Sequence, residues 1–176
     1  MNMVQDLAAR TLLVILVAAV VQDFMYMKIS NRLILMGILS SLAFGFLTGG
    51  LRQVLYVLVN ISFPVFVLYL FYLLGVLGAG DIKLFSIIGG FTNFKLLTGC
   101  MFYSFVAAAV IAVGKMLYNR NLRISVFKAG IFFRSIPREG LVSYHREWAE
   151  RRNLMHFSVP ILIGYMVAVL HWKLYR

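Results

Sequence analysis

Apolar windows of about 20 residues recur along the chain, and they constrain its fold more than any other feature. Four are centred on TLLVILVAAVV, VLYVLVNISFPVFVLYLFYLLGVL, LLTGCMFYSFVAAAVIAV and LMHFSVPILIGYMVAVL. A helix of about 20 apolar residues crosses a hydrocarbon core of about 30 Å. Only 13% of the residues are charged and the mean hydropathy is +0.89, whereas roughly a quarter of a soluble domain is charged. The sequence therefore predicts an all-α, polytopic membrane protein.

The apolar pattern divides into six helical segments within a single membrane-embedded domain over residues 1–176. The segments are 8–27, 32–49, 53–77, 82–94, 96–117 and 154–173. The fourth segment is short, since about 13 residues at a rise of 1.5 Å cover roughly 20 Å. It is therefore either a re-entrant piece or a short span in a thin place of the bilayer.

Basic residues favour a crossing by this fourth segment. The stretch 119–153 carries eight Arg and Lys residues against three Glu, and the turn KISNR at 28–32 carries two more. If the fourth segment crosses, both basic stretches lie on the same side of the membrane, as the positive-inside rule requires of cytoplasmic loops. We therefore predict six spans, both termini outside, and a basic cytoplasmic loop at about 119–153.

The basic charge also bears on partners. Lys and Arg total 17 against six acids, which gives a net charge of +11. In a membrane protein this excess marks cytoplasmic loops beside anionic lipid more often than a nucleic-acid site. We expect the lipid bilayer as a partner and no nucleic acid. The loop 119–153 is either a solvated loop resting on lipid headgroups or a dedicated interfacial binding element.

Asp23 and Asp81 are the two carboxylates that this topology places at membrane depth. Asp6 lies in the amino-terminal tail, and the three glutamates lie in the basic loop. If its helix continues to Lys28, Asp23 sits about 7–8 Å inside the cytoplasmic end. Asp81 follows the third segment, which returns to the same side. Topology therefore predicts that the two acids face each other, and ionisable groups inside a span are functional candidates by default.

Two carboxylates in a low-dielectric site share one proton, because both cannot ionise comfortably. The ionised acid takes a proton from water and the neutral acid donates one to a peptide carbonyl, so the pair needs no metal, cofactor or covalent nucleophile. Gly78 and Gly80 would let the chain bend and a substrate backbone approach closely. Lys83 would either bias the charge of the pair or reach the lipid headgroups.

Simpler structural roles compete with this interpretation. Asp81 could be only the N-cap of the fourth segment, and Asp23 could pair with Lys28 or Arg32. Asn31 is expected to cap the second helix. The single Cys100 excludes a disulfide framework within the chain and a cysteine cluster for zinc.

Three stretches resemble the type IV prepilin peptidases and the related archaeal preflagellin peptidases. GAGDIKLFSIIGG, which contains Asp81, resembles their G-x-G-D signature and its apolar extension. Asp23 precedes a basic turn ending Ile-Ser-Asn where the family has Ile-Pro-Asn. FSVPILIGY resembles the family's final span. The match covers about 20–95 and 154–170.

The resemblance implies a membrane-embedded aspartic endopeptidase in the cytoplasmic membrane of a prokaryote. It would cut the short, basic leader from prepilin-like precursors on the cytoplasmic side, after a glycine and before an apolar helix. Asp23 and Asp81 would be the catalytic pair. Bifunctional members have an extra Cys-x-x-Cys region and also methylate the new amino terminus. This chain starts at the first span, so peptidase activity alone is expected.

Two rival functions remain. Intramembrane carboxylates also serve as proton relays, so the chain could be a proton-coupled carrier or a carrier subunit. It could also be a membrane scaffold whose basic loop binds lipid or a partner. Presenilin-like and signal-peptide-peptidase-like enzymes share G-x-G-D, but they carry a Tyr-Asp pair on the preceding helix, which does not fit Gln22–Asp23.

Overall fold

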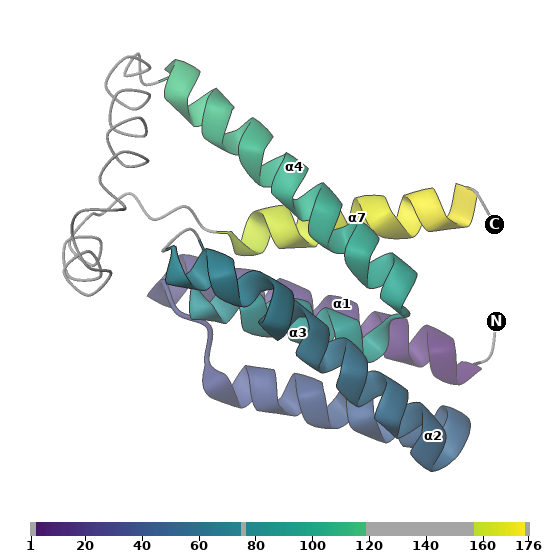
Figure 1. Cartoon of the computed structure of the whole chain (residues 1–176). Helices are drawn as coiled ribbons and strands as arrows, with labels where there is room; N and C mark the ends of the chain where they lie inside the picture. Colours follow the sequence, from purple (N-terminus) through teal and green to yellow (C-terminus); the bar gives the residue numbers. More distant parts are fainter. Residues whose placement is uncertain (1–2, 75–76, 119–156, 175–176) are drawn as a thin grey trace. The chain divides into compact units, whose positions relative to one another are not determined.

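The computed structural model describes residues 3–74, 77–118 and 157–174 (Figure 1). Every regular element in these residues is a helix: α1 (Met3–Tyr26), α2 (Asn31–Leu73), α3 (Ala79–Phe91), α4 (Phe94–Tyr118) and α7 (Ser158–Leu174). The all-α prediction is confirmed. The basic loop at 119–153 lies outside the described residues.

Three of the described helices are long and apolar enough to cross a membrane: α1, α2 and α4 from Phe94 to Lys115. The final helix, α7, is apolar but shorter, with 17 residues. Large apolar side chains lie on the outside, and Phe66, for example, is 86% exposed. These helices suggest a membrane protein, because lipid tails would cover such side chains where water would not.

The chain reverses direction in the middle of α2. Its 43 residues would make a straight rod about 65 Å long, roughly twice the thickness of a hydrocarbon core. The helical backbone is interrupted at Gly49 and Gly50, and Gly50 has a φ of +61° that few other residues adopt. Beyond the bend the second half folds back, so that Val57 packs against Gly45. The two halves correspond to the predicted segments 32–49 and 53–77 (Figure 1).

The short helix α3 is the most enclosed of the described elements. Eight of its 13 residues are buried: Ile82, Leu84, Phe85, Ser86, Ile87, Ile88, Gly89 and Gly90. A helix that is apolar nearly all round belongs in the interior of a bundle. Glycines allow its close approach to α2, because a Cβ at Gly89 would collide with the Asn60 backbone and a Cβ at Gly90 with the Ser41 side chain.

Two polar side chains of α2 meet the turn between α3 and α4. The Asn60 Nδ2 donates to the Thr92 carbonyl at 3.1 Å, and the Phe94 N–H donates to the Tyr56 hydroxyl at 3.2 Å. Tyr56 and Asn60 lie about 9–15 Å along the helix from the bend at Gly49–Gly50. The α3–α4 turn therefore does not reach the end of the bundle at which α2 bends. It lies at a depth in the membrane where unpaired backbone N–H and C=O groups would be costly.

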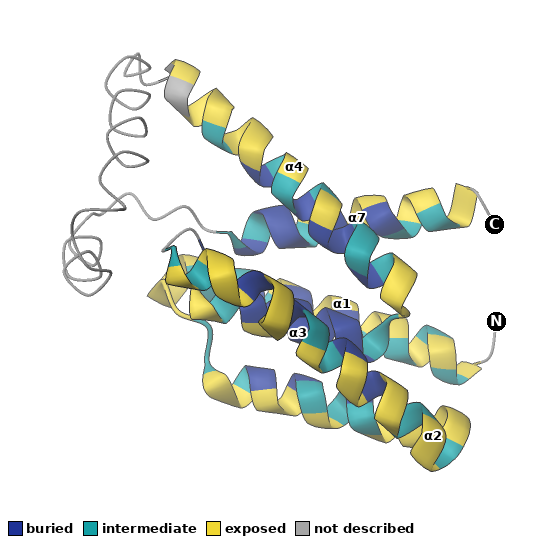
Figure 2. Cartoon of the chain, viewed as in Figure 1, coloured by how far each residue is buried: buried dark blue, intermediate teal, exposed yellow. Residues whose placement is uncertain are grey.

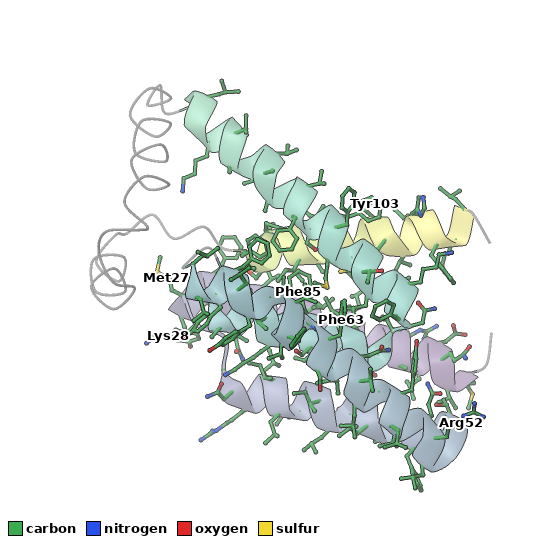
Figure 3. The ribbon with its side chains drawn as sticks, in the orientation of Figure 1. Met27, Lys28, Arg52, Phe63, Phe85 and Tyr103 are labelled. Carbon is green, nitrogen blue, oxygen red and sulfur yellow. The ribbon has the colours of Figure 1, made fainter. Side chains whose placement is uncertain are left out.

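The helical segments of the first compact unit, Met1–Val106 with His156–Arg176, alternate in direction. α4 starts beside the end of α7, where Lys95 lies over Trp172, and Phe105 contacts Phe157 at the start of α7. The α1–α2 turn, the start of α3 and the start of α7 thus share one end of the unit. Figure 3 shows Lys28 at this end and Arg52 at the opposite end.

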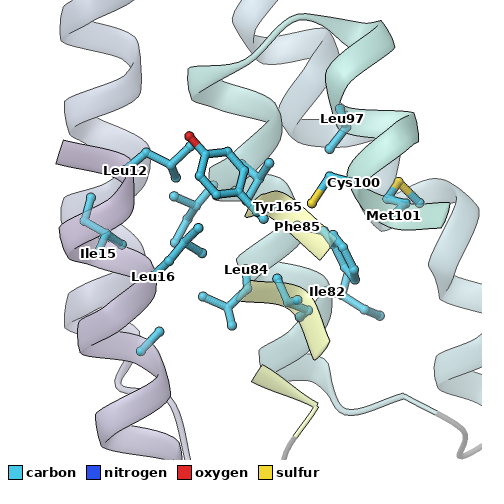
Figure 4. Packing of buried hydrophobic residues seen from close by; sticks show 14 of the residues in the cluster. Leu12, Ile15, Leu16, Ile82, Leu84, Phe85, Leu97, Cys100, Met101 and Tyr165 are labelled. Carbon is cyan, nitrogen blue, oxygen red and sulfur yellow. The ribbon is translucent and has the colours of Figure 1, made fainter. Parts of the chain in front are cut away.

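The core of this unit contains side chains from all five described helices. Figure 4 shows the convergence of Leu16 from α1, Phe85 from α3, Cys100 from α4 and Tyr165 from α7. In Figure 2 the buried residues gather where helices meet, while the outer faces of α1 and α2 are exposed. The core thereby fixes the relative positions of the helix ends that carry the two aspartates.

Candidate active site

Asp23 lies in the last turn of α1. The helix ends at Tyr26, and Met27 adopts a left-handed φ of 51°. The Met27 N–H donates to the Asp23 carbonyl at 2.9 Å, which closes the helix as left-handed C-terminal residues commonly do. Because the helix stops before Lys28, Asp23 is about 4.5 Å from its end and shallower than the predicted 7–8 Å.

Asp81 lies in the first turn of α3, three residues after the N-cap. The N-cap is Gly78, so the alternative in which Asp81 is only the N-cap of this helix does not hold. Its carboxylate Oδ2 accepts a hydrogen bond from the Gly78 N–H at 3.2 Å. Asp81 therefore satisfies one backbone donor at the helix start and leaves its other carboxylate oxygen for a second partner.

The fold brings the two carboxylates to one place. Asp23 and Asp81 are both half-buried, and they are near enough for their charges to interact. The contacts between the start of α3 and the α1–α2 turn place them there, including Gly80 against Ile29. Two carboxyl groups this close to each other have the arrangement that general acid–base hydrolysis uses.

Ser158 joins this site, and the sequence interpretation did not include it. Its hydroxyl donates to the Asp23 Oδ2 at 2.6 Å, and its side chain is buried with 1% exposure. Ser158 is the first residue of α7, within FSVPILIGY. The resemblance of that stretch to a family span was the available signal. A serine in an apolar helix does not indicate a site residue until its hydrogen-bond partner is known.

Hydrogen bonds connect the α1–α2 turn and the start of α2 with α1 and α3. Lys83 Nζ donates to the Asn31 Oδ1 at 2.9 Å, and the Ser30 N–H donates to the Gln22 Oε1 at 3.0 Å. Ser30 is the N-cap of α2, since its hydroxyl accepts from the Arg32 N–H at 3.2 Å. The expected cap at Asn31 is therefore wrong by one residue. Asn31 instead links α2 to α3 through Lys83.

The two predicted glycines differ in their surroundings. Gly78 has a φ of −76°, which any residue can adopt, but a Cβ there would lie 3.1 Å from the Asp81 Oδ2. A Cβ at Gly80 would make ordinary contact with Ile29, at 3.4 Å. The space beside the carboxylate, more than backbone freedom, is what distinguishes position 78.

Comparison with protein families adds to this geometry. The model of the type IV leader peptidase family matches residues 11–113, a range that includes both aspartates and the Gly-Ala-Gly step. No curated protein and no solved structure matched the chain. Because the family match spans more than half of its residues, the chain belongs to the type IV leader peptidase family.

Proposed function

We propose that the protein is a membrane-embedded aspartic endopeptidase that removes the leader peptide of prepilin-like precursors. The observation that carries the proposal is the meeting of Asp23 and Asp81, from two helices, near enough for their charges to interact. Membership of the type IV leader peptidase family supports peptide hydrolysis. The paired carboxylates support the aspartic class.

The hydrolysis needs one ionised and one neutral carboxyl group. The ionised carboxylate takes a proton from water, whose oxygen bonds to the carbonyl carbon of the scissile peptide. The electron pair of the C=O bond moves to the carbonyl oxygen, and the neutral carboxyl protonates that oxygen. When the C–N bond breaks, the amine leaves with a proton from the first carboxyl group. The second group, now a carboxylate, takes a proton from a hydroxyl of the tetrahedral intermediate as that bond breaks, so both groups return to their starting protonation states.

The proposed orientation has six spans, both termini outside and the aspartates at the cytoplasmic face. The alternating helices and the re-entry of the chain at Ser158, beside Asp23, support it. The basic turn containing Lys28 and Arg32 lies at the same end, as the positive-inside rule expects of the cytoplasmic side.

The proposed substrate has a short basic leader followed by an apolar helix, with cleavage after a glycine between them. Its helix would lie in the bilayer beside the apolar outer faces of the enzyme. The leader would remain at the cytoplasmic surface, where the extended scissile segment reaches the pair. Lys83 and the glycines at 78 and 80 support the turn that carries Asp81.

A reconstitution experiment separates the peptidase from a proton-coupled carrier. The purified protein is placed in liposomes with a prepilin-like precursor and an internal pH-sensitive dye. We expect cleavage, seen as a mobility shift and as a new amino terminus by mass spectrometry, without proton flux. An intact precursor together with protein-dependent proton flux would instead identify a carrier.

A further inference from the structure

The hydrogen bond from Ser158 to Asp23 joins residues 135 positions apart in the chain. Its length of 2.6 Å falls in the range of about 2.5–2.7 Å that is usual when a hydroxyl donates to an ionised carboxylate. Ser158 is fully buried, so bulk water does not compete with Asp23 for its hydroxyl. This contact links the end of α1 to the start of α7.

Asp23 needs such a donor because its own helix disfavours a negative charge. It lies in the last turn of α1, which contains no basic residue, and the C-terminal end of a helix carries partial negative charge. α7 approaches with its opposite, positive end. Within α7 the Ile161 N–H donates to the Phe157 carbonyl. Pro160 has no N–H, and the N–H groups that precede it in the first turn have no acceptor within the helix.

Asp81 has a weaker donor. The hydrogen bond that its Oδ2 accepts comes from the Gly78 N–H in its own turn, at 3.2 Å and on an exposed residue. An amide at this distance favours a carboxylate less than a buried hydroxyl at 2.6 Å does. The two members of the pair therefore differ in how well the protein supports their charged forms.

We propose that Ser158 is a positioning residue that keeps Asp23 as the ionised member of the pair. Asp23 is then the general base that takes the proton from water, and Asp81 is the general acid that protonates the carbonyl oxygen. This division of roles rests on the proposed peptidase function. The hydrogen bond and its effect on the charge of Asp23 do not.

The charged groups on the described elements around Asp23 remain constant in the test. They come from α3, from the α1–α2 turn and from the start of α2: Asp81, Lys83, Lys28 and Arg32. Since a Ser158 variant changes none of them, a shift in pH dependence reports the loss of the hydroxyl.

The first measurement is the pH profile of kcat/KM for Ser158→Ala and Ser158→Thr. In the alanine variant we expect the acid limb to move up by about one pH unit, which is a tenfold loss at low pH and little loss at high pH. The direction follows because a base without its donor is protonated at a higher pH. The threonine variant keeps the hydroxyl and its profile should follow the wild type.

Ser104→Ala is the matched control. Ser104 is also buried and packs against α7 at Gly164, but its hydroxyl donates to the Cys100 carbonyl of its own helix at 2.7 Å. Its acid limb should not move. If Ser158→Ala does not fold, Ser158→Cys replaces it, since a thiol is a weaker donor. A uniform loss of rate with an unmoved acid limb would overturn the proposal.

Infrared titration of Asp81→Asn gives a readout that needs no cleavage. The C=O stretch of protonated Asp23, assigned by its loss in Asp23→Asn/Asp81→Asn, should appear at higher pH when Ser158→Ala is added. An unchanged titration would overturn the proposal even in an active peptidase. If the titration shifts but the wild-type protein cleaves no precursor, the result would support the role of the hydrogen bond and refute the peptidase function.

Discussion

At the scale of single residues, the space around Asp81 is as important as its charge. Its Oδ2 lies close to position 78, where the absence of a side chain leaves room for the carboxylate. A methyl group there would lie 3.1 Å from that oxygen, which is tighter than most contacts of this kind. The carboxylate would have to shift by a few tenths of an ångström.

Gly78→Ala should therefore slow cleavage by about threefold to tenfold, because small displacements of catalytic groups carry large penalties in rate. The negative φ of Gly78 accepts alanine, so thermal unfolding should change little. Steady-state kinetics with the purified variant measure the effect. A wild-type rate would show that the carboxylate tolerates the crowding and that position 78 does not support it.

The sequence predicted Asp23 and Asp81 because carboxylates are rare in an apolar chain and each has a membrane-level position. Ser158 escaped prediction because serines are common in such helices and its partner is 135 positions away. The predicted N-cap of α2, Asn31, differs by one residue from the observed N-cap, Ser30. Such details depend on local torsion angles and on partners that only the folded chain supplies.

At the scale of elements, α3 depends on glycines for its position. Its approach to α2 leaves no room for a Cβ at Gly89, which faces the Asn60 backbone. Backbone cannot move aside as a flexible side chain can, so the helices would have to separate. That movement would also displace Asp81 at the other end of α3.

Gly89→Ala should destabilise the protein by about 1–3 kcal/mol, the usual effect of overpacking a core. Gly99→Ala in α4 is the matched control, since a Cβ there meets nothing within 4 Å. It should change stability by less than about 1 kcal/mol. Unfolding titrations in detergent compare the two variants, and equal stabilities would contradict the packing of α3 on α2.

The helices of the described residues were predictable because membrane helices have long apolar sequences and short polar turns. Their ends were less predictable. The bend of α2 depends on the non-helical torsion angles of Gly49 and Gly50. The support of the α3–α4 turn by Asn60 and Tyr56 depends on contacts between distant residues. Periodicity along the chain does not contain this information.

At the scale of the whole molecule, the proposed orientation makes both termini external. Alkaline phosphatase, which folds only outside the cytoplasm, should be active when fused after Arg176. A green fluorescent protein inserted in 119–153 should fluoresce, because we predict that this loop is cytoplasmic. If the phosphatase fused after Arg176 is inactive, and a green fluorescent protein fused at the same position fluoresces, the chain would instead have an odd number of spans.

The most direct measurement is cleavage of a prepilin-like precursor by purified Asp23→Asn, Asp81→Asn and Asp6→Asn. The first two changes each remove an ionisable group from the pair while keeping its size, so both variants should fold normally and lose at least about a thousandfold in rate. Asp6→Asn makes the same chemical change in the first turn of α1 and should cleave like the wild type. Near-normal turnover by either of the first two variants would contradict a two-aspartate peptidase.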